Sequence, residues 1–370
     1  MQKKFFKTFF LLAIFSMLPN FAWAAPTVTS AIPATTFSNN AVVNITGSGF
    51  GTKSQAKPLV WASFDGGSTS PSNLGSITSW ADDITAAPYG MQLTSNNCYA
   101  GAGCLQNFPG YEANGTAIGV QTNLLDRGQK YYLNFRRRDT YTPTDQNVKF
   151  LRFWPSGYGQ PDFYASDGGG ANVGWHRLYL ESGDDVTSYT RFSLNWPVPN
   201  ATWRNDEYLV QLNSAVGAHD GTFISSINSA TTDSISDFQT DASSTPGVQS
   251  MIYFQDEVSV DLVAGQGPLQ DGTVIQYDNI YLDSTWQHIL ICAGSAWNTR
   301  GNCEVQIPSA WNDSSATVTI NQGNFFNGST EYLYVVDASG TPSNPQTIVF
   351  GSSEISDTTP PAAPSGLSVQ

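Results

Sequence analysis

The chain has few positive charges. Its 370 residues include 16 Lys and Arg against 30 Asp and Glu, and charged residues of both signs make up only 12% of the sequence. We expect the first 24 residues, which hold Lys3, Lys4, Lys7 and no acid, to be removed. That leaves 13 cations against the same 30 acids, a net charge of −17. Such a chain repels nucleic acids and anionic membrane surfaces, so we expect neither as a partner.

Long segments with the apolar period of a helix are also lacking. Short alternating runs rich in Tyr, Phe, Val, Ile and Thr are separated instead by Gly, Asn, Asp and Ser. With 33 Gly and 13% aromatic residues, this pattern predicts an all-β fold of the sandwich or jelly-roll kind. No Gly-rich loop precedes a helix and no serine nucleophile elbow is present, so phosphate binding and serine hydrolase chemistry have no support.

The N-terminus has the pattern of a signal peptide. Three Lys precede the apolar run 9–18, and Ala22-Trp23-Ala24 is a small-x-small cleavage site. The apolar run is too short to cross a bilayer, and no later segment resembles a membrane helix. We therefore predict a signal peptide over residues 1–24, cleavage near Ala24, and a secreted, periplasmic or cell-surface protein.

Cysteine is scarce as well. The four Cys allow three connectivities, and their spacing favours the local pairs Cys98–Cys104 and Cys292–Cys303. Neither pair has the C-x-x-C spacing of a zinc site or a redox motif. We predict two structural disulfides, in keeping with an oxidising compartment.

Against this acidic background, arginine and aromatic residues recur together in four predicted strands. Side chains alternate across a strand, so in the strand 131–138 the even positions face away from Tyr131, Leu133 and Phe135. The segments 148–154, 175–181 and 189–196 repeat the pattern. If the four strands share a sheet, these faces form one basic and aromatic groove. The predicted ligand-binding residues are Tyr132, Asn134, Arg136, Arg138, Arg152, Trp154, Trp175, Arg177, Tyr179 and Arg191.

Such a groove suits an acidic polysaccharide, because guanidinium groups hold carboxylates through two hydrogen bonds and aromatic rings stack on sugars. Arg137 follows the parity of Leu133 and Phe135, so we expect it to point at the opposite sheet or the strand's edge, and if it is buried it must be paired. The alternative is that the arginines are solvated, or paired with nearby acids such as Asp139, Glu181 and Asp184.

The two ends of the chain resemble one family. The segment 26–52, ending Val-Val-Asn-Ile-Thr-Gly-Ser-Gly-Phe-Gly-Thr, resembles the opening strands of an immunoglobulin-like IPT/TIG domain, and 303–320 and 327–340 resemble its later strands. The resemblance implies a small β-sandwich built from 25–58 and 289–353, with a large domain inserted at 59–288. Two separate small modules are the alternative. Residues 354–370 form a proline-rich tail or linker.

Residues 59–288 resemble the concanavalin A-like jelly rolls of secreted lectins, glucanases and polysaccharide lyases. Phe64-Asp65-Gly66-Gly67, Trp203 to Tyr208 and Tyr277 to Asp283 carry the resemblance. It implies a large jelly-roll sandwich beside the small immunoglobulin-like β-sandwich, and a carbohydrate ligand. It also implies a structural calcium joining the first and last strands, with Asp65 and Asp278 as candidate ligands. The alternative is two acids in solvated turns. We predict no essential cofactor.

Three functions remain open. The first is a non-catalytic carbohydrate-binding or adhesion protein, the second an endolytic polysaccharide lyase that cleaves a uronate polymer by β-elimination, and the third a structural module without a ligand. A lyase needs a base and an acid, for which the candidates are His176, His219, Tyr179 and Tyr189. Jelly-roll alginate lyases carry R-x-E-L-R, Q-x-H and Y-x-K-x-G-x-Y-x-Q strands. Here 135–139 loosely resembles the first, and the other two are missing.

Overall fold

The fold is all-β, as predicted. The computed structural model describes residues 24–32, 36–80, 91–107, 118–121, 127–140, 147–155, 162–167, 176–181, 189–193, 201–215, 217–240, 249–255, 257–259 and 274–351. The predicted signal peptide, apart from Ala24, and the predicted tail lie outside these residues. All pairings between the named strands are antiparallel, and the one helical element in the described residues is the 3₁₀ turn Trp297–Thr299. No helix in the described ranges is long and apolar enough to cross a membrane.

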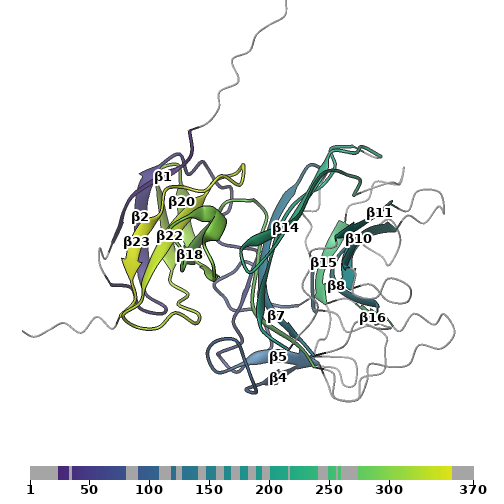
Figure 1. The fold of residues 1–370 in the computed structure, drawn as a ribbon, viewed down its shortest axis with the longest axis horizontal. Helices are drawn as coiled ribbons and strands as arrows, with labels where there is room; N and C mark the ends of the chain where they lie inside the picture. The colour runs from purple at the N-terminus through teal and green to yellow at the C-terminus, as the bar shows by residue number, and fades with distance from the viewer. Residues whose placement is uncertain are drawn as a thin grey trace, which may run out of the picture.

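Both ends of the chain build one small sandwich (Figure 1). One sheet has the order β1 (Thr27–Ile32), β2 (Val42–Ser48), β21 (Ser315–Thr319) and β20 (Ile307–Asn312). The other has the order β19 (Cys303–Val305), β18 (His288–Cys292), β22 (Thr330–Val336) and β23 (Gln346–Val349). Val43 pairs with Val318 across β2 and β21, and both lie in a core with Ile291 and Leu333. The relation to IPT/TIG domains and the predicted domain boundaries stay predictions.

The middle of the chain forms two larger sheets. The eight-stranded sheet contains β14 (Ala230–Phe238), β13 (Gly221–Ile227), β12 (Arg204–Gln211), β7 (Lys130–Asp139), β17 (Ile275–Asp283), β5 (Cys104–Asn107) and β4 (Met91–Thr94), with β3 (Val60–Ala62) also paired to β17. The seven-stranded sheet contains β11 (Tyr189–Ser193), β10 (His176–Glu181), β9 (Asp162–Asp167), β8 (Asn147–Pro155), β15 (Gln249–Gln255) and β6 (Ile118–Gln121), with β16 (Glu257–Ser259) also paired to β8. Figure 1 shows the eight-stranded sheet between the small sandwich and the seven-stranded sheet.

The jelly-roll core lies between these two sheets. Phe135 and Tyr208 from the eight-stranded sheet belong to one buried cluster with Phe153 and Phe254 from the seven-stranded sheet. The rings of Phe135 and Phe254 meet edge to face with centroids 5.7 Å apart. Apolar residues at alternate positions of each strand therefore close the space between the sheets.

Arg137 is buried in this core, as its parity predicted. Its side chain is 0% exposed, its Nε lies 3.0 Å from a carboxylate oxygen of Asp139, and its guanidinium lies 4.1 Å from the ring centroid of Phe150. Arg204 pairs with Arg137 across β12 and β7 and places its Nη2 2.8 Å from Oδ2 of Asp139. Neutralisation inside the protein makes the buried charges tolerable.

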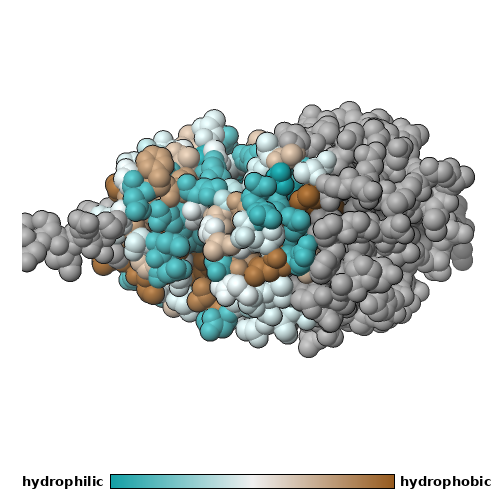
Figure 2. All heavy atoms as spheres, turned by 90° about the horizontal axis from the view of Figure 1, so that it is seen from below, coloured by the Kyte–Doolittle hydropathy of each residue, from teal (hydrophilic) through white to brown (hydrophobic). Residues whose placement is uncertain are grey.

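Both predicted disulfides, Cys98–Cys104 and Cys292–Cys303, are present, the second joining β18 to β19. Figure 2 shows hydrophilic and hydrophobic residues interspersed over the described part of the face it draws. The exposed large hydrophobic residues among those described are Ile32, Val42 and Phe326, all in the small sandwich. Single exposed apolar residues of this kind are ordinary on a folded protein.

We predict that Arg137→Ala lowers the free energy of unfolding by about 3–5 kcal/mol, because it leaves Asp139 with less compensation in the core. Urea unfolding followed by tryptophan fluorescence measures the change. Lys57→Ala, at an exposed position, is the control and should alter stability by less than about 0.5 kcal/mol. Similar losses in both variants would contradict the structural role of Arg137.

Candidate functional site

The predicted ligand-binding residues of β7 face the small sandwich. Tyr132, Asn134 and Arg136 are all 2% exposed or less. Strand β7 belongs to the eight-stranded sheet, whereas Arg152, Arg177 and Arg191 lie in strands of the seven-stranded sheet. The four arginine-bearing strands therefore do not share a sheet, and the condition for a single groove is not met. Periodicity fixes which residues of a strand share a face, but β7 obtains its neighbours β12 and β17 from distant parts of the chain.

Arg136 is neutralised by the sandwich. Its Nη2 lies 3.0 Å from Oε1 of Glu304 and also donates to the carbonyl of Cys303. The guanidinium lies 4.2 Å from the ring centroid of Tyr99, whose hydroxyl donates to the same Glu304 oxygen at 2.5 Å. Burial, together with the negative charge of Glu304, raises the pKa of Tyr99, so the phenol keeps its proton and remains a donor. The Nη2 group that Arg136 would offer a ligand is used here.

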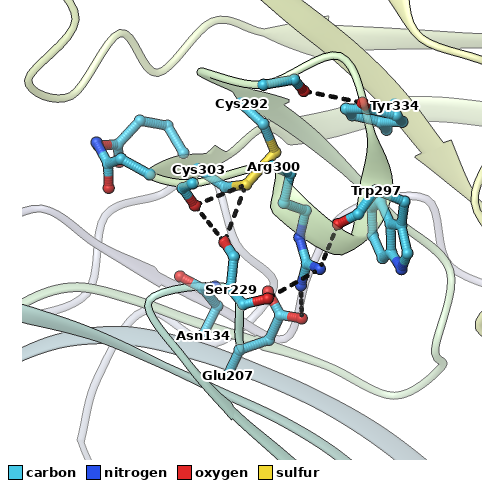
Figure 3. Close-up of a disulfide and its surroundings, with 12 residues drawn as sticks. Asn134, Glu207, Ser229, Cys292, Trp297, Arg300, Cys303 and Tyr334 are labelled. Atoms are coloured by element: carbon cyan, nitrogen blue, oxygen red, sulfur yellow. Dashed lines mark hydrogen bonds and ion pairs between the residues drawn. A yellow bond between two sulfur atoms is a disulfide. The ribbon is translucent and has the colours of Figure 1, made fainter. Parts of the chain in front are cut away.

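A second buried ion pair joins the modules beside the disulfide Cys292–Cys303 (Figure 3). Arg300 of the sandwich places Nη2 2.9 Å from Oε1 of Glu207 on β12, and its guanidinium lies 3.9 Å from the ring centroid of Trp297. The carbonyl of Ser229, in the turn between β13 and β14, accepts a further hydrogen bond from Arg300 at 3.3 Å. Charged groups of the sandwich and of the jelly roll are thus paired across the boundary between the two, which we call the seam.

Tyr132 stacks on His288 at the same seam, with centroids 3.6 Å apart and planes 4° from parallel. Nδ1 of His288 lies 2.7 Å from the carbonyl oxygen of Trp286, so this nitrogen carries the proton and donates it. Burial lowers the pKa of His288 from 6.5 to about 3, which keeps the imidazole neutral. The ring therefore serves as a flat packing partner and not as a charged group.

Arg138, farther along β7, is only partly buried. Its Nε donates to the carbonyl of Ala201 at 2.8 Å, and its Nη1 donates to Oε1 of Gln276 at 2.9 Å. It remains a predicted ligand-binding residue, in a sheet different from that of Arg152.

The other sheet carries a cross-strand row that we call the Arg152 row. Tyr253 of β15 pairs with Arg152 of β8, which pairs with Tyr164 of β9, which pairs with Tyr179 of β10. Gly119 and Thr190 extend the row to β6 and β11. Leu151 and Phe153, on either side of Arg152, lie in the core, as do Ile252 and Phe254 on either side of Tyr253. By strand alternation these positions fall on the outer face of the sheet, turned away from the core.

Tyr164 and Tyr253 were not predicted. Each is a single tyrosine among apolar neighbours, and neither segment contains an arginine to mark it. Only the pairing register brings them beside Arg152, whose side chain is 4% exposed. Lys149, Ser166, Arg177 and Phe192 form a second row that alternates in the same way with the core positions, so Lys149 and Arg177 lie near the Arg152 row in the sheet.

The remaining predicted residues are divided. Arg191 pairs with Leu178, a core residue, and Arg177 pairs with Phe192, so the expectation that Arg177 and Arg191 share a face is wrong. The register between β10 and β11 depends on the connection between them, which periodicity does not reveal. Trp154 is in β8, where it pairs with Met251, and Trp175 lies outside the described residues.

Of the four catalytic candidates, only Tyr179 is in the Arg152 row. His176 pairs with Asp167 and Ser193 and has the parity of the core residue Leu178, while Tyr189 pairs with Leu180. His219 is exposed in the turn between β12 and β13, in the other sheet. The described strands therefore place neither His176 nor His219 in the Arg152 row.

The two predicted calcium ligands bind the same loop. Oδ2 of Asp278 accepts hydrogen bonds from the backbone N–H groups of Tyr99 and Ala100 at 3.1 and 3.4 Å, and Oδ1 of Asp65 accepts one from Ala102 at 2.7 Å. Burial raises the pKa of Asp278 well above its usual value, and the charge of Asp65 adds to the effect.

Calcium takes six to eight oxygen ligands. Within the described ranges, no group of three or more His, Cys, Asp or Glu side chains could hold a metal, and these two carboxylates are already bonded to backbone N–H groups. The described residues thus do not fit a complete calcium site, and calcium binding stays a prediction.

We predict that buried His288 makes the protein lose stability in acid. The unfolded chain takes up this proton near pH 6.5 and the folded chain only near pH 3, so the unfolded state binds more protons between these values and stability falls as the pH falls. The limiting slope is about 1.4 kcal/mol per pH unit. Urea unfolding over a pH series should show a shallower decline for His288→Phe, which keeps a ring against Tyr132. Identical slopes for both proteins would rule out this role for His288.

No protein-family model matches the sequence, and no curated protein is detectably similar to it. Among solved structures, the endo-β-1,4-glucuronan lyase of the fungus Trichoderma reesei aligns with 56% of this chain and 92% of its own, at 14% identity and a TM-score of 0.41. The alginate lyase Aly36B aligns with 62% of this chain and 98% of its own, at 15% identity and a TM-score of 0.37. The cellulose-induced protein Cip1 aligns with 56% and 91%, at 14% identity and a TM-score of 0.37. Function must therefore be inferred from the residues of this chain.

Proposed function

We propose that this protein is a secreted carbohydrate-binding or adhesion protein whose jelly roll binds an acidic polysaccharide on the outer face of the seven-stranded sheet. The observation that carries the proposal is the Arg152 row. In this row one arginine and three tyrosines lie side by side, one on each of four neighbouring strands. Neighbouring strands lie about 4.8 Å apart, so these four positions span roughly 14 Å, enough to contact several consecutive sugars.

The chemistry of the row suits a uronate. Guanidinium groups hold carboxylates through two parallel hydrogen bonds, and tyrosine rings offer apolar faces to sugars and hydroxyls to their oxygens. Lys149 and Arg177 in the neighbouring row would add positive charge to a protein that is otherwise strongly acidic. The corresponding outer face of the eight-stranded sheet is less suitable, because Glu304 and His288 of the sandwich contact Arg136 and Tyr132 there.

The second candidate function is endolytic lyase activity at the same row. β-Elimination needs a cation to neutralise the uronate carboxylate, a base to remove the proton beside it, and an acid to protonate the departing oxygen. Arg152 with Tyr164 and Tyr179 supplies residue types for all three roles, and that neighbourhood is what favours this candidate. The third candidate, a structural module without a ligand, requires that Arg152 serve only internal contacts.

Residues 59–288 would form the ligand-binding domain, inserted in a sandwich made from 25–58 and 289–353. Two chain connections and the buried pairs Arg136–Glu304 and Arg300–Glu207 would then hold the binding domain in a fixed orientation. Export directed by the predicted signal peptide, with cleavage near Ala24, would place this assembly outside the inner membrane.

We predict that the protein binds uronate-bearing polymers more tightly than neutral ones on a glycan array. Arg152→Ala should weaken that binding by about 1–3 kcal/mol, the value of a hydrogen bond to a charged group, while Arg127→Ala, outside the sheet, should not. Isothermal titration measures both, and circular dichroism checks that each variant is folded. Equal affinity for neutral and acidic polymers would remove the proposal.

Lyase activity is tested separately. The unsaturated product of β-elimination absorbs in the ultraviolet, so incubation with alginate, pectate, ulvan and glycosaminoglycans should raise the absorbance if the second candidate is correct, and Tyr164→Phe or Tyr179→Phe should reduce the rate. Binding without absorbance on every polymer would favour the non-catalytic function.

A further inference from the structure

A buried lysine and a buried aspartate meet where the jelly roll joins the small sandwich. Lys53 lies on the connection from β2 to β3, and Asp283 is the last residue of β17, just before the connection that returns to β18. Nζ of Lys53 contacts Oδ2 of Asp283, and the side chains are 0% and 1% exposed. The pair therefore links the two points at which the chain enters and leaves the jelly roll.

The surroundings of the pair are largely aromatic. The hydroxyl of Tyr281 donates to Oδ2 of Asp283 at 2.9 Å, and the ring centroid of Trp311 lies 5.3 Å from Nζ. Nζ also donates to the carbonyl of Ala56 at 3.2 Å. Oδ1 of Asp283 is buried and makes no hydrogen bond within the described part of the chain. Nζ is thus held against one carboxyl group that has few other contacts.

Burial favours the uncharged form of Asp283. It is the largest cause of the raised pKa of Asp283, which the charge of Lys53 only partly opposes. Two charges removed from water cost several kcal/mol unless good geometry and further hydrogen bonds compensate them. Transfer of one proton from Nζ to Oδ2, along the hydrogen bond already present, gives a neutral amine beside a carboxylic acid. A neutral, desolvated lysine amine is a nucleophile.

We propose that Lys53 and Asp283 form an intramolecular isopeptide bond. The lone pair of Nζ attacks Cγ of Asp283, the C–O bond to Oδ2 breaks, and Oδ2 leaves as water with the proton received from the ammonium and a second proton from Nζ. One amide and one water are produced from one ammonium and one carboxylate, so no oxidant, reductant or other reactant is needed.

Tyr281 assists by its hydrogen bond to the leaving oxygen. Burial raises the pKa of Tyr281 well above its usual value, so its hydroxyl keeps its proton and donates throughout. A donor held at Oδ2 stabilises the negative charge that develops there as the C–O bond breaks. Tyr281 is two residues from Asp283 on the same strand, and strand alternation places both side chains on one face.

The bond would close a covalent ring around the jelly roll. Force applied to the two ends of the small sandwich would pass from Lys53 directly to Asp283 without stretching the strands between them. This property suits a protein that holds a polymer outside the cell, but the bond does not depend on the proposed ligand or on any catalytic activity.

The test is the intact mass of the full mature chain, denatured and with both disulfides reduced. We expect a mass lower than that of the amino-acid sequence by one water, and a proteolytic digest containing a branched peptide that joins Lys53 to Asp283. Lys53→Arg keeps a cation but supplies no amine for the bond, so it should show the full mass of its sequence. A wild-type mass equal to that of its sequence, with no branched peptide, would overturn the proposal and leave a buried ion pair.

Tyr281→Phe tests the mechanism apart from the bond. It keeps the ring and removes the donor to Oδ2, so freshly purified protein should be a mixture of two masses that differ by one water, and the lower mass should increase on incubation. This readout does not require the variant to be as stable as the wild type. Complete linkage at the wild-type rate would overturn the role given to Tyr281.

Discussion

The need to neutralise charge inside the protein governs how its two parts fit together. Arg136 with Glu304, Arg300 with Glu207, and Lys53 with Asp283 all lie where the small sandwich and the jelly roll meet. A buried charge without its partner costs several kcal/mol, so a shift of one part against the other would separate these pairs and be strongly opposed. These ion pairs therefore fix the position of the sandwich against the eight-stranded sheet.

This seating determines which surface of the jelly roll is suited to a ligand. One sheet presents its outer face to the sandwich and uses arginine and tyrosine there to build an interface. The other sheet repeats the same residue types in the Arg152 row, away from the core. Under the proposed function, similar alternating sequences would serve two purposes, and the difference between them would come from the neighbouring module and not from the strands themselves.

The sequence predicted well the features that depend on local geometry. Alternation along β7 placed Arg137 in the core with Phe135, and short spacing identified both disulfides. Features that depend on distant pairing could not be predicted in the same way. Nothing in the segment 131–138 indicates that Glu304, far along the chain, neutralises Arg136. Arg177 and Arg191 lie on opposite faces of the sheet because β10 and β11 pair in a register that sets Arg191 opposite Leu178 and not opposite Arg177. Tyr164 and Tyr253 could be recognised as candidate site residues only from their pairing with Arg152.

The distribution of the few cations has a consequence for any acidic ligand. Lys53, Arg136, Arg137, Arg152, Arg204 and Arg300 are all buried, so much of the positive charge of the mature chain is enclosed. The predicted mature chain carries a net charge of −17, and such a charge opposes the approach of a polyanion within about 10 Å of the surface at moderate salt. In the proposed function, attraction would then come from short-range contacts along the Arg152 row and the row that holds Lys149 and Arg177. Salt weakens both the long-range repulsion and the short-range pairing. The first effect assists association with a polyanion, whereas the second opposes it. If the proposed function holds, an acidic protein with a small cationic row would select ligands that fit the row closely and would reject polyanions that are merely highly charged.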